Sequence, residues 1–175
     1  AAGDIGFWVI DTMVNPMGAK EEIAQRREVW DTLKARLKAE GVNKDLRDYP
    51  PREARDALED FPENMRRLGL FVIAEEDRLH QAEDTVEATN IPPLGKCMTK
   101  SHEGLRDQYE ISCPELDWMA RHCLNTPGVL GARLTGRGLG GCLVLLEKGG
   151  ADLGPFLLEY ERIFGFQARM FRAVP

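Results

Sequence analysis

The sequence lacks any long apolar run and any excess of basic residues. No segment reaches the roughly 18 consecutive apolar residues that a membrane span needs, so we expect no membrane association. The first residues, AAGDIGFWVID, have no basic region and carry an acid at Asp4, unlike a secretory signal peptide. The net charge of −6 argues against a nucleic-acid binder that works through a general basic field. A local basic patch stays open.

The cysteines show no spacing that is typical of a metal site or a disulfide framework. The four cysteines form no CxxC pair and follow no framework spacing: Cys97, Cys113, Cys123 and Cys142. This pattern predicts neither a metal site nor a disulfide. A cytoplasmic protein with reduced thiols fits it best.

The order of predicted elements indicates one α+β domain. A length of 175 residues with 43% hydrophobic residues is enough for one sizeable core. The short apolar run 7–10 predicts a central strand. Helices are predicted at 19–40, 52–59, 63–88, 94–109, 114–123 and 153–163, and further strands at 129–134, 142–147 and 166–171. This order favours a mostly antiparallel sheet of about four strands, with helices packed on one face.

Two of these helices show an apolar stripe, which predicts the side that each one buries. The stripe of 19–40 consists of Ile23, Trp30, Leu33 and Leu37. The stripe of 63–88 consists of Leu68, Val72, Leu79, Ala82 and Val86. The prolines of Asn90-Ile91-Pro92-Pro93 predict a break, after which helix resumes at Leu94.

A glycine-rich turn, 135-TGRGLGG-141, joins two apolar strands. Glycine reaches positive φ without steric cost and lets the backbone come close to a ligand, so several N–H groups could converge on a phosphate. The spacing is neither GxxxxGK[ST] nor a GxGxxG that opens a βαβ unit. On spacing alone, a tight hairpin is favoured over a phosphate loop.

Two long motifs in order point to a known family. The first is 101-SHEGLRDQYEISCPELD-117, and the second runs from Gly131 through Arg133 and the glycine turn to Cys142. Together they resemble the C-terminal half of galactokinases, members of the GHMP kinase superfamily. Looser agreement at 9–12, 26–27, 75–79 and 165–166 extends the resemblance over nearly the whole chain. The resemblance implies that residues 1–175 form a GHMP-kinase C-terminal domain.

The resemblance also implies a function, and a missing half. Galactokinases transfer the γ-phosphoryl group of ATP to the anomeric hydroxyl of galactose, in a cleft between two domains. The GEHxDY-like, GxGLSSSAA and GxMDQ-like motifs of the family's first half are absent here. Phosphoryl transfer depends on a phosphate cradle, Mg²⁺ and a base or orienting acid. We therefore expect no catalytic residue or metal ligand in this chain, ATP and Mg²⁺ only in the complete enzyme, and an N-terminal half in the same or a partner chain.

By resemblance to galactokinases, the glycine turn should line the active-site cleft. The resemblance places these residues near the phosphates and the sugar: Thr135, Gly136, Gly138, Gly140 and Gly141. Arg137 departs from the family, which has Gly or Ala there. Its guanidinium either donates to a phosphate or turns to solvent, and the second reading is favoured.

Other positions are assigned by alignment with the family. Aligning the Arg26-Arg27 pair places Ile23 where galactokinases have a sugar-contacting tyrosine, which puts the identity of the sugar in question. The alternative is that Ile23 is a core residue. Asp11 and Thr12 could approach the nucleotide, and the competing interpretation is a strand-end cap. His102 is expected to be a polar pin between helices.

Three hypotheses remain at this level. The first is the C-terminal half of a sugar 1-kinase that acts on galactose. The second is a non-catalytic sugar sensor or interaction protein of the same fold, and the third is a kinase for another sugar. The missing half should also leave an exposed cleft face, which predicts self-association into a homo-oligomer.

Overall fold

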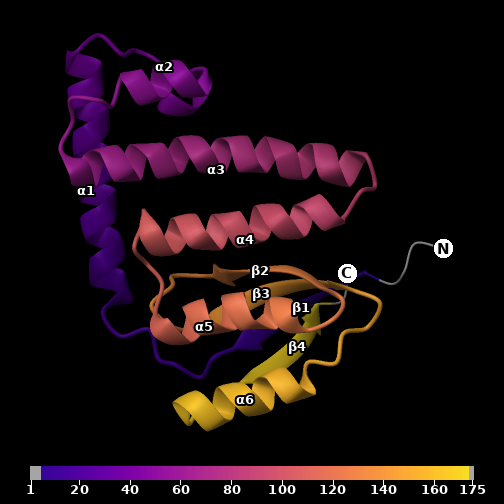
Figure 1. Cartoon of the computed structure of the whole chain (residues 1–175). Helices are drawn as coiled ribbons and strands as arrows, with labels where there is room; N and C mark the ends of the chain where they lie inside the picture. Colours follow the sequence, from indigo (N-terminus) through magenta and orange to yellow (C-terminus); the bar gives the residue numbers. More distant parts are fainter. Residues whose placement is uncertain (1–4, 174–175) are drawn as a thin grey trace.

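A computed structural model describes residues 5–173 and shows helices stacked on and beside one sheet (Figure 1). In chain order the elements are β1 (Ile5–Asp11), α1 (Ala19–Ala39), the 3₁₀ helix η1 (Leu46–Asp48), α2 (Pro51–Asp56), α3 (Glu63–Glu87), α4 (Pro92–Asp107), α5 (Pro114–His122), the 3₁₀ helix η2 (Cys123–Asn125), β2 (Val129–Thr135), β3 (Cys142–Lys148), α6 (Gly154–Phe164) and β4 (Arg169–Ala173). No helix in this described range is both long and apolar enough to cross a membrane.

The four strands form one antiparallel sheet in the order β2-β3-β1-β4. β1 lies inside the sheet, where Ile10 pairs with Leu143 of β3 on one side and with Met170 of β4 on the other. The α+β class, the antiparallel sheet and the central place of the first strand are therefore confirmed.

One face of the sheet supports the main core. Ile10, Leu143 and Leu145 lie on this face and are fully buried. Helices α5 and α6 pack against it, and the α5 ring of Trp118 stacks on Phe156 of α6 at 5.5 Å between ring centroids. Each such large apolar side chain contributes about 1.5–3 kcal/mol when it leaves water. This burial fixes the sheet that carries the glycine turn.

Helix α4 flanks the edge strand β2. His102 of α4 is buried, and its Nδ1 accepts a hydrogen bond from the N–H of Leu134 at 3.1 Å. Its Nε2 lies 3.1 Å from Oδ1 of Asp117 at the start of α5. Because Nδ1 is an acceptor, the ring proton sits on Nε2 and is donated to Asp117. His102 thus joins α4, α5 and β2, and the expected polar pin between helices is confirmed.

A second, smaller core lies away from the sheet. It joins the C-terminal part of α1 to η1, α2 and the N-terminal part of α3, and its buried members are Leu33, Leu37, Leu46, Ala54, Leu58, Phe61 and Ile73. Figure 1 shows α1 crossing the start of α3 with α2 beside it. This core holds α1 in place as a long arm that reaches back to the glycine turn.

Three sequence expectations need correction. The stripe on α3 is wrong beyond its first half, because Leu79 is 52% and Val86 56% exposed. Helices α1 and α2 cover only the N-terminal part of α3 (Figure 1). The predicted break between the two helices is present at residues 88–91, but α4 begins two residues earlier than predicted, because Pro92 and Pro93 occupy its first turn, where a missing N–H is harmless. The last strand begins later than predicted, at Arg169, because residues 166–168 connect it to α6.

Candidate functional site

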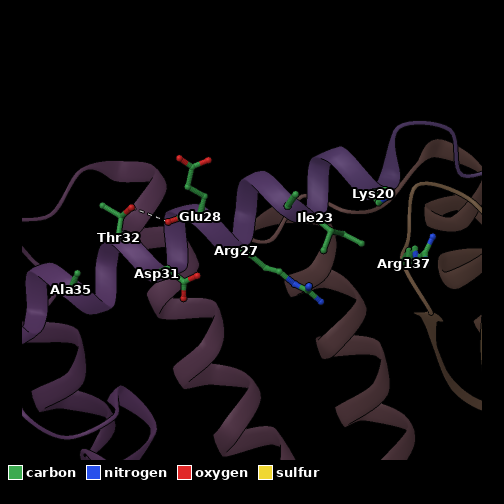
Figure 2. A pocket seen from close by; sticks show the side chains of 9 residues that line it. Lys20, Ile23, Arg27, Glu28, Asp31, Thr32, Ala35 and Arg137 are labelled. Carbon is green, nitrogen blue, oxygen red and sulfur yellow. Dashed lines mark hydrogen bonds between the residues drawn. The ribbon is translucent and has the colours of Figure 1, made fainter.

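A groove of about 860 Å³ runs along α1 and ends at the glycine turn. Eight of its residues come from α1 and the ninth from the turn: Lys20, Ile23, Ala24, Arg27, Glu28, Asp31, Thr32, Ala35 and Arg137. Figure 2 shows the side chains of Ile23 and Arg27 extending from α1 toward the glycine turn, which carries Arg137. Residues far apart in the sequence thus share one concave surface.

Helical periodicity explains which α1 side chains face the groove. Lys20, Arg27 and Asp31 recur at spacings of seven and four, so they share one side of the helix. Leu33 and Leu37 lie on another side and are buried in the second core. The helix therefore separates a packed side from a side that is open to a ligand or another domain.

The two arginines that followed Ile23 in the family alignment have different places. Arg26 is a structural residue: its Nε donates to the carbonyl of Tyr109, and its Nη2 donates to that of Glu110 at 2.6 Å. Its Nη1 pairs with Glu22 one turn earlier. Arg27 instead lines the groove. Arg26 therefore anchors α1 to the turn after α4 and leaves Arg27 available for binding.

The glycine turn is held close to two neighbouring loops. A Cβ on Gly138 would lie 2.0 Å from the carbonyl oxygen of Ile111, and one on Gly140 would lie 2.6 Å from that of Val14. Both glycines also have positive φ, at 73° and 125°. Only glycine fits such close approaches in this conformation. The turn is consequently packed against its two neighbouring loops.

The outer part of the same turn is open. Thr135, Gly136 and Arg137 are exposed, and a Cβ on Gly136 would meet nothing within 4 Å. The backbone N–H groups of the two exposed residues Gly136 and Arg137 donate to no acceptor in the described residues. Successive N–H groups in a turn of positive and negative φ can cradle an anion. The exposed part of the turn thus leaves two backbone donors without an acceptor.

Thr12, which directly follows β1, is inaccessible to a ligand. Thr12 is fully buried, and its hydroxyl donates to the carbonyl of Gly141 at 2.7 Å. The carbonyl of Thr12 accepts from the hydroxyl of Tyr160 at 2.9 Å. Asp11 caps the strand end by accepting from the N–H of Met13. Thr12 therefore fastens the turn, and for Asp11 the geometry is that of a strand-end cap.

The cysteine at the end of the turn has a raised pKa. Burial, and then the charge of Asp11, raises the pKa of the Cys142 thiol above its ordinary value. A thiol must lose its proton to act as a nucleophile. The raised pKa makes Cys142 less reactive than an ordinary thiol at neutral pH. The described residues also hold no group of three or more His, Cys, Asp or Glu side chains placed to bind a metal ion.

Sequence reasoning missed two cationic residues of the site, Lys20 and Arg27. With Arg137 they supply three positive charges, and none of the three forms an ion pair in the part of the chain that the structure describes. Ile23 is half-buried at the edge of the groove, between the core stripe and the cationic side. The signal was available, because Lys20 and Arg27 are seven residues apart on the helix side that the apolar stripe leaves free.

Comparison with known proteins agrees with this architecture. The family model described as "GHMP kinases C terminal" matches residues 82–152. A galactokinase from Streptomyces coelicolor is 36% identical over 180 residues, which cover 100% of this chain and 45% of the relative. A protein described as a putative galactokinase from Treponema pallidum is 39% identical over 117 residues, or 62% of this chain and 29% of the relative.

Among solved structures, Lactococcus lactis galactokinase complexed with galactose superposes with a TM-score of 0.80 at 26% identity. The match covers 99% of this chain and 46% of that structure. The chain thus spans less than half the length of the relatives that it matches. On sequence and fold alike, the chain belongs to the GHMP kinases and corresponds to the C-terminal half of galactokinases.

Proposed function

We propose that the chain is the C-terminal half of a galactokinase-like sugar kinase and supplies one wall of its active-site cleft. In this proposal residues 1–175 form one domain, and the complete cytoplasmic enzyme phosphorylates the anomeric hydroxyl of galactose or a related sugar with ATP. The carrying observation is the groove itself, in which the open glycine turn and three unpaired cations face the same space. The similarity to galactokinases along the whole chain supports the same conclusion.

Different residues of the groove suit different parts of the substrates. The free N–H groups of the turn and the guanidinium of Arg137 suit phosphate oxygens, since charge-assisted donors bind them best. Lys20 and Arg27 add positive charge along α1, where the acids Glu28 and Asp31 also line the groove. Ile23 offers an apolar surface on which the ring of a sugar can pack, without a hydroxyl to select its substituents. This arrangement favours binding and orientation over bond-making.

The chemical step needs groups from elsewhere. ATP and Mg²⁺ supply the transferred phosphoryl group and the charge neutralisation when they are bound in the complete enzyme. The turn of this chain fits the phosphates, but no residue of this chain is assigned as base or metal ligand. We therefore place those groups in the N-terminal half, within the same chain or in a partner chain.

The test is ATP-dependent phosphorylation of galactose, measured with this chain alone and with the N-terminal half from the same gene or genome supplied. We expect activity only in the second case. Retained binding of ATP and galactose without turnover would reject the kinase and support the non-catalytic sensor. Activity with another sugar and none with galactose would support the third hypothesis, for which Ile23 in place of tyrosine is the motivating observation.

The surface left uncovered suggests how the chain behaves without its other half. Phe7 and Phe171 are 37% and 57% exposed, and they lie on the sheet face opposite the main core together with half-buried Val9, the cross-strand partner of Phe171. Met13 and Met17, which precede α1, are also exposed. Exposed apolar clusters of this kind favour association. We expect the isolated chain to form homo-oligomers in sedimentation velocity, and a clean monomer at high concentration would contradict this.

A further inference from the structure

A second cavity, of about 420 Å³, lies between α3, α4 and β2 and is separate from the α1 groove. Its wall is largely apolar and includes Phe71, Val72, Leu79, Leu94, Cys97 and Met98. Its volume falls within the range of roughly 300–1,000 Å³ that small-molecule sites occupy. The cavity shares no residue with the α1 groove.

Arg133 brings an uncompensated charge into this apolar cavity. It lies on β2 opposite Val144 of β3 and lines the cavity. Its Nε is buried and has no hydrogen-bond partner, and Arg133 forms no ion pair within the described residues. Buried polar groups in native proteins are nearly always paired, so an orphaned guanidinium N–H calls for an acceptor.

The acid Glu75 also lines the cavity, and it is already engaged. Glu75 accepts from Nε of Arg78 at 2.5 Å with one oxygen and from the hydroxyl of Ser101 at 2.7 Å with the other. Arg78 itself keeps a buried Nη2 without an acceptor. Both carboxylate oxygens of Glu75 therefore already accept hydrogen bonds, and the unpaired Nη2 of Arg78 lies beside Gly104, which does not line the cavity.

The remaining charges of the cavity belong to its rim. Arg47 is paired with Asp45, with 2.9 Å between Nε and Oδ1, and the charge of Glu76 also acts on Arg47. Glu76 further lies 3.7 Å from Nε2 of His80. These contacts leave Arg133 as the cation without a counter-charge.

We propose that this cavity binds a small organic carboxylate with an apolar body. The orphaned guanidinium of Arg133 suits a carboxylate, which can accept two parallel N–H donors. The apolar wall suits a hydrocarbon or aromatic group attached to that carboxylate. β2 carries Arg133 two residues before Thr135, so such a ligand would contact the strand that leads into the glycine turn.

The test compares three probes on the isotope-labelled chain by NMR: phenylacetate, its neutral isostere phenylacetamide, and inorganic phosphate. We expect phenylacetate to shift the amide signals of residues 94–98 and 131–134 with a Kd of about 1 mM or below, and phenylacetamide to bind at least about tenfold more weakly. Equal binding of the two isosteres, tighter binding of phosphate at the same signals, or no shift with phenylacetate would each overturn the proposal.

Three variants complete the test. Arg133→Gln should remove the preference for the carboxylate, whereas Lys100→Gln, an exposed cation on α4 outside the cavity, should leave it unchanged. Ala82→Trp fills the cavity from α3 without changing any charge and should abolish binding of both aromatic probes. This variant keeps the proposal falsifiable if Arg133→Gln does not fold. Undiminished binding of phenylacetate in Ala82→Trp would locate the ligand elsewhere.

Discussion

Gly131 of β2 and Gly95 of α4 meet backbone to backbone. A Cβ on Gly131 would lie 1.9 Å from the carbonyl oxygen of Gly95, and a Cβ on Gly95 would lie 2.2 Å from the carbonyl oxygen of Leu130. This contact brings α4 against the edge of the sheet. Two turns further along α4, His102 can therefore accept from the N–H of Leu134. The edge strand that leads to the glycine turn is covered in this way.

Gly131→Ala tests this contact. Both clashing groups are backbone atoms, so neither can move aside without separating α4 from β2. We expect the free energy of unfolding to fall by about 1–3 kcal/mol or more, as for overpacked interiors. Urea unfolding followed by far-UV circular dichroism measures the change.

Gly154→Ala is the matched control. Its Cβ would meet only the side-chain oxygen of Asp152, at 3.1 Å, in the first turn of α6. We expect a change within about 0.5 kcal/mol. If Gly131→Ala were as stable as Gly154→Ala, the close approach of α4 and β2 would be wrong.

His102→Ala tests the pin between α4, α5 and β2. The substitution leaves the N–H of Leu134 without its acceptor in a buried place, and an unsatisfied buried donor costs about 1–3 kcal/mol. Urea unfolding should show a loss of this size. His80→Ala is the control, since the side chain of His80 is 66% exposed and its loss should change stability little. Equal effects of the two substitutions would remove the structural role of His102.

The sequence predicted most of the helices and strands, because these depend on local pattern. Short apolar runs predicted β1 to β3, and the glycine-rich stretch between two of them predicted the turn that carries Arg137 into the groove. The sequence was insufficient where long-range packing decides. Whether Leu79 and Val86 are buried depends on how far α1 and α2 extend over α3, and no local pattern contains that information. The different roles of Arg26 and Arg27 depend likewise on the carbonyls of a distant turn, at Tyr109 and Glu110.

Stability should fall in alkaline solution because of a buried thiol. Burial raises the pKa of Cys123 to about 12, whereas a cysteine in an unfolded chain titrates near about 8.5. Above about pH 8.5 the unfolded chain therefore loses a proton that the folded chain keeps, so the free energy of unfolding decreases as pH rises. The slope from one such thiol approaches about 1.4 kcal/mol per pH unit. Burial also raises the pKa of Tyr160, which adds to the effect at higher pH.

Urea unfolding at about pH 7.5, 9 and 10 measures this slope. Cys123→Ala removes the titrating group, so we expect a flatter dependence on pH from a lower starting stability, since a small cavity replaces the sulfur. Cys97→Ala, at a half-buried surface of α4, should keep the slope of the parent chain. Identical slopes in the parent and Cys123→Ala would show that another group controls the alkaline transition.

Arg137 is the residue whose substitution best tests the proposed cleft. It is exposed at the tip of the glycine turn, lines the α1 groove and has no ion-pair partner among the described residues. A charged hydrogen bond to a phosphate contributes about 1.5–3 kcal/mol. In the complete enzyme, Arg137→Gln should therefore raise the KM for ATP about tenfold or more, with little change in the KM for the sugar.

The outcome of Arg137→Gln separates three roles for this side chain. Arg162→Gln, an exposed arginine on α6 away from the groove, is the control and should leave both KM values unchanged. If Arg137→Gln matches this control, the guanidinium turns to solvent and the turn holds phosphate through its backbone alone. If the KM for the sugar rises and that for ATP does not, Arg137 contacts the sugar. Its positive charge would then pair with an acidic substituent on the sugar. An increase confined to ATP is the result that places Arg137 beside the phosphates.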